Sequence, residues 1–133
     1  MNAQDKRRQA RRVKACAVML TTDGKVHIVK LHKRDGLYLK AMQAVVGGNI
    51  EPIEIAIGIT EKSFVMLVNE EGLVGSFKYN RNASALYGQE LFGNALIVGR
   101  GNDDFKLFSE DVAYHLAQMV HMRLYRQEIS RYD

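Results

Sequence analysis

The clearest structural signal in this sequence is Phe64-Val65-Met66-Leu67-Val68-Asn69-Glu70-Glu71-Gly72-Leu73. Its first five residues are all apolar, which is typical of a strand that is covered on both faces. We therefore expect residues 64–68 to form the middle of a sheet. Asn69 and Gly72 occupy the first and fourth positions that a type I turn favours. The sequence thus predicts a bulged hairpin turn at 69–72 and a returning strand over 73–79.

A short helix is expected directly after that returning strand. Asn80 can cap it, because asparagine accepts a hydrogen bond from the first turn, and Gly88 suits its left-handed end. If the chain returns as a hairpin, Asn80 lies about 20 Å from the turn at 69–72 by the rise of a strand. The polar residues around the turn and around Asn80 would then be two separate sites.

The residues before this stretch predict a hairpin, a helix and an edge strand. Apolar runs on both sides of Asp23-Gly24 indicate a hairpin within 15–32. Apolar residues spaced by three and four indicate a helix over about 39–46 that ends at Gly47-Gly48. Alternating isoleucines indicate a strand over 50–59, and Pro52 favours an edge position because proline cannot donate to a ladder.

The residues after it predict one more strand at 94–99, a turn at 101–104 and a helix from Glu110 to about Arg126, with Ser109 as its N-cap. The fold class is therefore α+β, with a mainly antiparallel sheet of about five or six strands, a central helix, a short helix and a long C-terminal helix. We expect a basic flexible arm at 1–14, a single domain at 15–126 and a C-terminal tail at 127–133.

Composition places the chain among ordinary globular proteins. It has 133 residues, of which 47% are hydrophobic and 26% charged, enough for one domain with its own core. A single cysteine, Cys16, excludes an internal disulfide and suits a small core residue in a reducing compartment. Apolar runs are too short to cross a membrane. We expect a cytoplasmic protein, in the host cell if a phage encodes it, with no membrane partner.

The positive charge of the chain is concentrated in its first fourteen residues. The net charge is +4, but residues 1–14 hold six basic side chains and one acidic one, while the remainder holds 13 basic and 14 acidic ones. Neutralising phosphates releases counterions, so this arm is a candidate for non-specific, salt-dependent nucleic-acid binding. It has no aromatic residues for base stacking, and a solvated tail is the alternative interpretation. The candidate residues are Arg7, Arg8, Arg11, Arg12 and Lys14.

Asn80, Arg81 and Asn82 form the candidate ligand site. A guanidinium beside a helix start suits a carboxylate or phosphate, such as that of a small nucleotide. Ordinary helix capping is the alternative explanation of Asn80. Glu70 and Glu71 are read as a solvated turn, with a functional pair as the alternative.

Residue spacing supports no catalytic or metal site. No serine lies in a G-x-S-x-G context, and His115 and His121 are six residues apart, which points them in different directions on a helix. We therefore expect no catalytic residues, no metal and no cofactor. A non-enzymatic protein is favoured, and the question of enzymatic activity stays open.

Three motifs in order resemble a known family. They are Met42-Gln43-Ala44-Val45-Val46-Gly47-Gly48-Asn49-Ile50-Glu51, Val68-Asn69-Glu70-Glu71-Gly72 and Asn80-Arg81-Asn82-Ala83. In these residues, within about 36–115, the chain is similar to small phage and plasmid proteins known as domain of unknown function 3846. The positions that match the family pattern are Gly47, Gly48, Glu51, Asn69, Glu70, Gly72, Asn80 and Arg81. The basic arm and the helix after Tyr114 depart from that pattern.

The resemblance implies an accessory protein of a mobile element or its host. We expect a non-enzymatic binding protein that contacts or sequesters a host component, with a protein as a possible partner. The alternatives are a nucleic-acid-associated protein that uses residues 1–14 and a binder of a small phosphate-bearing ligand. Met119, Met122 and Leu124 also suggest a homo-oligomer that forms through the C-terminal helix.

Overall fold

The sheet has the strand order β2-β1-β5-β4-β3, with β6 paired to the end of β5, and all its pairings are antiparallel. The computed structural model describes residues 2–6, 13–55, 57, 64–102 and 104–130, the last four by backbone alone. The strands are β1 (Cys16–Leu20), β2 (Val26–Lys30), β3 (Ile50–Ile55), β4 (Phe64–Asn69), β5 (Ala95–Arg100) and β6 (Phe105–Lys106). The α+β class and the antiparallel sheet predicted from the sequence are confirmed.

Strand β4 is apolar throughout because both of its faces are covered. Val65 and Leu67 belong to one buried cluster, and Met66 and Val68 to the cluster on the opposite face. β4 is an interior strand, as expected, although β5 rather than β4 occupies the centre of the sheet. Pro52 lies in β3 at the edge, where a missing ladder donor costs least.

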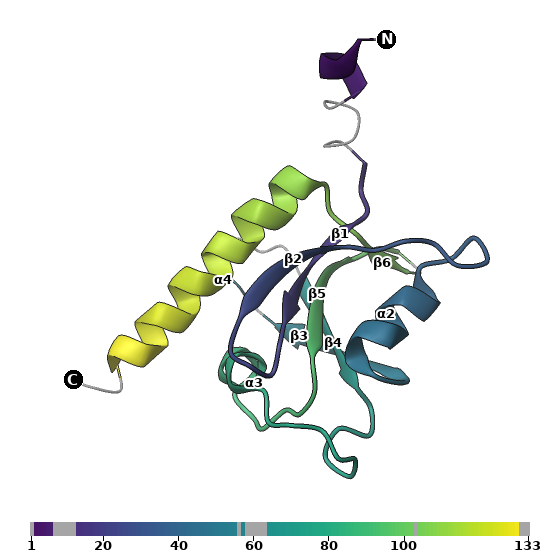
Figure 1. Ribbon diagram of the computed structural model, residues 1–133. Coiled ribbons are helices and arrows are strands. Elements are labelled where there is room, and N and C mark those ends of the chain that lie inside the picture. Colours follow the sequence, from purple (N-terminus) through teal and green to yellow (C-terminus); the bar gives the residue numbers. More distant parts are fainter. Residues whose placement is uncertain (1, 7–12, 56, 58–63, 103, 131–133) are drawn as a thin grey trace.

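The sheet is covered by helices on both faces (Figure 1). Helix α2 (Leu39–Val46) buries Met42 and Val46 against one face. Helices α3 (Arg81–Tyr87) and α4 (Glu110–Ser130) cover the other face, where Leu116 and Val120 enter the core. A helical turn at residues 3–6 lies at the N-terminus, away from the sheet (Figure 1).

Helix ends follow the predicted signals. Gly47 and Gly88 terminate α2 and α3 in the left-handed conformation, with φ of 84° and 88°. Ser109 accepts a hydrogen bond from the backbone N–H of Val112 at 3.3 Å and caps α4. α4 continues to Ser130, beyond the predicted end near Arg126.

The predicted returning strand at 73–79 is wrong. Residues 70–76 form turns and bends, and Leu73 and Val74 are 75% and 84% exposed. The physical reason is that β3 and β5 already pair with the two edges of β4, so a hairpin return has no free edge to join. Within residues 73–79, only Tyr79 forms a β-bridge, which is an isolated antiparallel bridge to Phe92.

Residues 105–108, which the sequence did not predict as a strand, lie between the end of β5 and the start of β1. Within this segment, β6 pairs with Gly99 and Arg100, and Phe108 exchanges backbone hydrogen bonds with Cys16 at 2.7 and 2.8 Å. The segment therefore fixes the start of β1 and places the Phe108 side chain beside β5.

Residues 7–12 of the arm and 131–133 of the tail lie outside the described residues. Within the described part of the chain, no helix is long and apolar enough to cross a membrane.

Candidate functional site

Asn80 holds three parts of the fold together. It is fully buried, and its Nδ2 donates to the backbone oxygens of Leu20 and Gly93, each at 2.9 Å. Its Oδ1 accepts from the N–H of Ala83 at 3.0 Å, which confirms the predicted cap. Because both ends of the amide are used within the chain, Asn80 has a structural role.

Asn82 and Arg81 both lie against the turn between β1 and β2. Asn82 donates to the backbone oxygen of Gly24 at 3.0 Å. A Cβ built at Gly24 would lie 2.8 Å from Nη2 of Arg81, so the guanidinium covers this glycine. Of the three predicted ligand residues, Arg81 alone is exposed.

The exposed Arg81 lines an open cavity of about 400 Å³ together with Tyr79, Ser84 and Glu90. A carboxylate in the lining opposes the binding of a phosphate. The anion site at Arg81 stays a prediction.

The family-motif residues around Asn69 also build the fold. Asn69 is buried, donates to the backbone oxygen of Val46 at 3.1 Å and accepts from the N–H of Glu71 at 2.8 Å. A Cβ at Gly48 would lie 2.9 Å from Nδ2 of Asn69, which explains why a glycine suits that position. Asn69 thus ties the end of α2 to the end of β4.

Glu70 and Glu51 are exposed. Asn49 donates to Oε1 of Glu70 at 3.1 Å, so this carboxylate holds the loop after α2. Gly72 is buried and approaches the backbone of Phe92, where a Cβ would lie 3.0 Å from the carbonyl oxygen.

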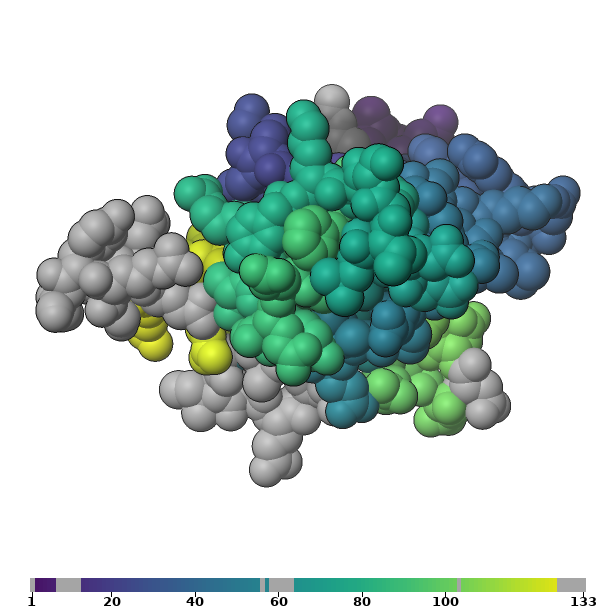
Figure 2. Space-filling view, turned by 90° about the horizontal axis from the view of Figure 1, so that it is seen from below, coloured from purple at the N-terminus to yellow at the C-terminus, as the bar shows by residue number. Residues whose placement is uncertain are grey.

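The residues around Asn69 and those around Asn80 share one end of the sheet, which corrects the predicted separation. Leu20, the partner of Asn80, pairs with Ala95, and the neighbouring Leu96 pairs with Leu67 of β4. The separation rested on the hairpin return, which is absent. Figure 2 views this end, and the segment between β4 and β5 covers much of it.

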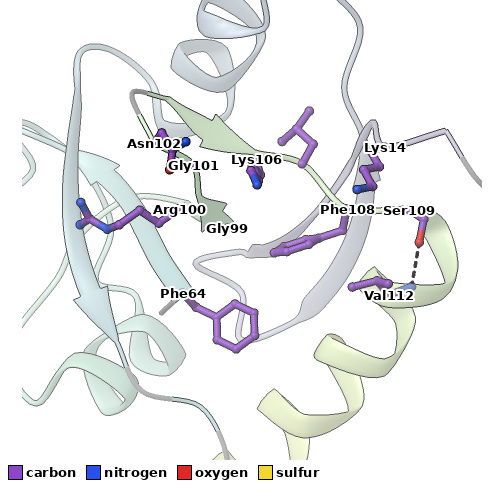
Figure 3. Close-up of a pocket in the computed structure, with 11 residues that line it drawn as sticks. Lys14, Phe64, Gly99, Arg100, Gly101, Asn102, Lys106, Phe108, Ser109 and Val112 are labelled. Atoms are coloured by element: carbon purple, nitrogen blue, oxygen red, sulfur yellow. Dashed lines mark hydrogen bonds between the residues drawn. The ribbon is translucent and has the colours of Figure 1, made fainter. Parts of the chain in front are cut away.

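The opposite end of the sheet holds a larger cavity, of about 610 Å³. Along β5, Ala95 and Ile97 fill the face toward α4, but the next residue on that face is Gly99. A side chain is therefore missing where the strand alternation would supply one. The resulting hollow lies between the first turn of α4, the end of β5 and β6, as Figure 3 shows.

Two phenyl rings line this hollow. Phe64 is opposite Gly99 in the β4–β5 pairing, and Phe108 lies 3.3 Å from a Cβ built at Gly99. The ring centroids are 6.2 Å apart and the rings are inclined by 65°, an edge-to-face arrangement. Sequence reasoning missed this pair because the two residues are 44 positions apart and meet only through the sheet.

Two lysines also line the cavity. Lys106 pairs with Gly99 and so shares its face of the sheet, and Lys14 is exposed at the base of the arm. Arg100 follows Gly99 in β5, so its side chain lies on the opposite face of the sheet, where its guanidinium is 2.7 Å from Oε1 of Glu54. None of the described lining residues is a carboxylate. The cavity therefore favours an anion that also carries an apolar surface.

A second basic group lies on the other side of the arm. Lys30, His32 and Arg34 line a cavity of about 280 Å³ beside α2. The N–H of Leu31 donates to the backbone oxygen of Ala15 at 2.8 Å, which places this segment next to Lys14. The predicted arm residues Arg7, Arg8, Arg11 and Arg12 lie outside the described residues.

The cysteine and the metal-ligating residue types are the groups from which a reactive thiol or a metal site would be built. Cys16 is buried, and burial raises the pKa of its thiol, as does the nearby Glu110 carboxylate, against an opposing effect of Lys30. Among the described residues, no three His, Cys, Asp or Glu side chains could hold an ion together.

Comparison with known families identifies the domain. A family model described as Domain of unknown function (DUF3846) matches residues 13–121. The chain belongs to this family. The DUF3846 match begins at Val13, within the last two residues of the arm, and continues past Tyr114 to His121. It thus includes the β1–β2 hairpin and more of α4 than the sequence motifs indicated.

Solved structures show a distant likeness of fold. The DUF3846 chain is similar to part of a protein described as "Crystal structure of small RNA methyltransferase HEN1", with a TM-score of 0.50 and 14% identity. The match covers 77% of this chain and 16% of that protein, and it shows the fold alone. Comparison with curated protein sequences found no significant match.

Proposed function

We propose that this DUF3846 protein is a non-enzymatic binding module whose partner is nucleic acid. The main support is the cavity at the base of the basic arm, which Lys14 and Lys106 line without a carboxylate among its described lining residues. Lysine and arginine side chains attract phosphates, and the release of counterions drives such binding. The arm would extend this contact along the strand.

The position of the second basic group supports the same partner. Lys30, His32 and Arg34 flank the arm on the side opposite the cavity. Basic residues thus lie on both sides of the point where the arm leaves the domain, with Glu110 as a nearby carboxylate, although the body of the chain carries a net charge of −1. A local excess of positive charge on a nearly neutral domain is typical of a phosphate-binding surface.

The resemblance to phage and plasmid proteins sets the proposed context. The module would act in the cytoplasm as an accessory protein of a mobile element or its host, and would contact or sequester a nucleic acid there. A small phosphate-bearing ligand at Arg81 has less support, because Glu90 lines the same cavity.

Fluorescence anisotropy with a labelled 20-nucleotide strand, titrated at several salt concentrations, tests the proposal. The double variant Lys14→Ala/Lys106→Ala should weaken binding and lower the slope of log Kd against log salt by roughly 1.5, because each phosphate contact contributes about 0.7 to 0.9. A variant with Arg7, Arg8, Arg11 and Arg12 changed to glutamine should lower the slope further.

The matched control is Lys25→Ala/Lys78→Ala, which removes the same charge. Both lysines are exposed at the other end of the sheet, Lys25 in the β1–β2 turn and Lys78 beside Gly93. This control should bind almost as the unmodified protein does. Equal losses in the two double variants would show that net charge alone drives binding and would contradict a site at the arm.

A further inference from the structure

We infer that the hollow at Gly99 takes one unstacked nucleobase, so that the module binds single strands in preference to duplexes. The inference rests on the proposed function and adds the class of nucleic acid to it. A base in a duplex is paired and stacked, whereas a base in a single strand is free to turn into a cavity beside the backbone.

The size and lining of the hollow fit a base attached to a phosphate. Its volume of about 610 Å³ is within the range of small-molecule sites. Phe64 and Phe108 offer ring surfaces for stacking, and Lys106 and Lys14 lie where the attached phosphates would run. Aromatic rings inside a basic groove are the usual combination of single-strand binding sites.

Gly99 is the residue that keeps the hollow open. Its alternation partners Ala95 and Ile97 are completely buried under α3 and α4, and a comparable side chain at 99 would fill the space. A Cβ there would lie 3.3 Å from Cε1 of Phe108 and 3.5 Å from Cβ of Lys106. A large residue at this position would therefore occupy the proposed base site and displace the ring.

An abasic strand tests the inference on the unmodified protein. Kd is measured by anisotropy for a 20-nucleotide single strand, for the same length of abasic strand with all its phosphates, and for the duplex. We expect the base-containing strand to bind about tenfold more tightly than the abasic one, which corresponds to about 1.4 kcal/mol of stacking. The duplex should bind more weakly than the single strand despite its higher charge.

Single variants test whether the preference for the base-containing strand depends on the residues that line the hollow. Phe64→Leu and Phe108→Leu keep an apolar side chain without a ring, and Gly99→Leu fills the hollow. Each should bring the affinity for the base-containing strand close to that for the abasic strand. The matched control is Phe92→Leu, because Phe92 and Tyr79 form a similar edge-to-face pair, 5.7 Å apart, at the other end of the sheet. This control should keep the difference between strands.

The outcomes separate the inference from the proposed function. Equal affinity for the abasic and base-containing strands, with salt dependence retained, would overturn the base site and leave the nucleic-acid module standing. No binding of any strand at 50 mM salt would overturn both. A free mononucleotide that binds as tightly as the strand would show that the occupant is a soluble nucleotide, which would overturn the preference for strands.

Discussion

At the scale of single residues, two buried side-chain amides organise one end of the fold. Asn80 and Asn69 are both buried and both use their donor and acceptor atoms within the chain. A buried polar side chain whose hydrogen bonds are all made within the protein organises the fold. These two residues set the end of the sheet at which α2 ends and α3 begins.

Replacing Asn80 with alanine should lower the free energy of unfolding by about 3 kcal/mol. About 1 kcal/mol comes from the lost helix cap, and the remainder from the buried carbonyl groups of Leu20 and Gly93 that lose their donor. Urea denaturation followed by circular dichroism measures the change. Asn102→Ala, at an exposed position, is the control and should stay within about 0.5 kcal/mol. A similarly small loss in Asn80→Ala would refute the structural role.

At the scale of elements, helices α2 and α3 end in the same way but in different surroundings. Gly47 and Gly88 are both left-handed C-caps. A Cβ at Gly47 would lie 2.9 Å from Cε1 of Phe77, whereas a Cβ at Gly88 would meet nothing within 4 Å. Phe77 also lies against Gly75 and Gly93, so its ring joins the loop after β4 to α2 and to the start of β5.

The pair Gly47→Ala and Gly88→Ala separates backbone strain from packing. Both should lose about 1 kcal/mol because a left-handed conformation disfavours a Cβ. Gly47→Ala should lose a further 1 to 3 kcal/mol, roughly the cost of overpacking, since the Phe77 ring has to move. Thermal and urea unfolding of the two variants provide the comparison. Equal losses of unfolding free energy in the two variants would mean that the loop carrying Phe77 moves aside at no cost in stability.

At the scale of the whole molecule, the two ends of the sheet differ in character. One end carries buried amides and tight glycine contacts, and the other carries the arm, an open cavity and a group of basic residues. Strands β1 and β5 connect the two ends and are largely buried, with Val18 and Ile97 completely so. The proposed ligand site thus lies at the end of the sheet opposite the buried amides.

Self-association through α4 is the whole-molecule prediction. Met119 and Leu124 pack against the core, but Met122 and Tyr125 are 59% and 64% exposed on the same helix. We expect a homo-oligomer in light scattering at high concentration, and dissociation in the variant Met122→Glu/Tyr125→Glu, because charges cannot be buried in an apolar interface without a partner. Lys33→Glu/Lys40→Glu, on exposed residues away from α4, is the control. A monomer at every concentration would exclude the interface.

Local patterns predicted most elements of this chain correctly because their signals are short in sequence. Alternation, helical spacing and the signals at Gly24, Gly47, Asn80 and Gly88 each act within a few residues. The error at 73–79 arose because alternation describes a strand but does not say whether a sheet edge is free to receive it. That depends on β3 and β5, which lie on the two sides of β4.

Residue patterns alone predicted the antiparallel α+β class, the helix boundaries within a few residues, the family motifs and a basic arm without aromatic residues. The residues that meet at the base of that arm could be found only from the folded chain. Phe64 and Phe108 come from distant segments, and they meet beside Lys14 because β4, β5 and the segment after β6 are neighbours in the sheet. The physical reason is that strand pairing joins residues by register, and register is set by the whole sheet rather than by neighbours in the chain.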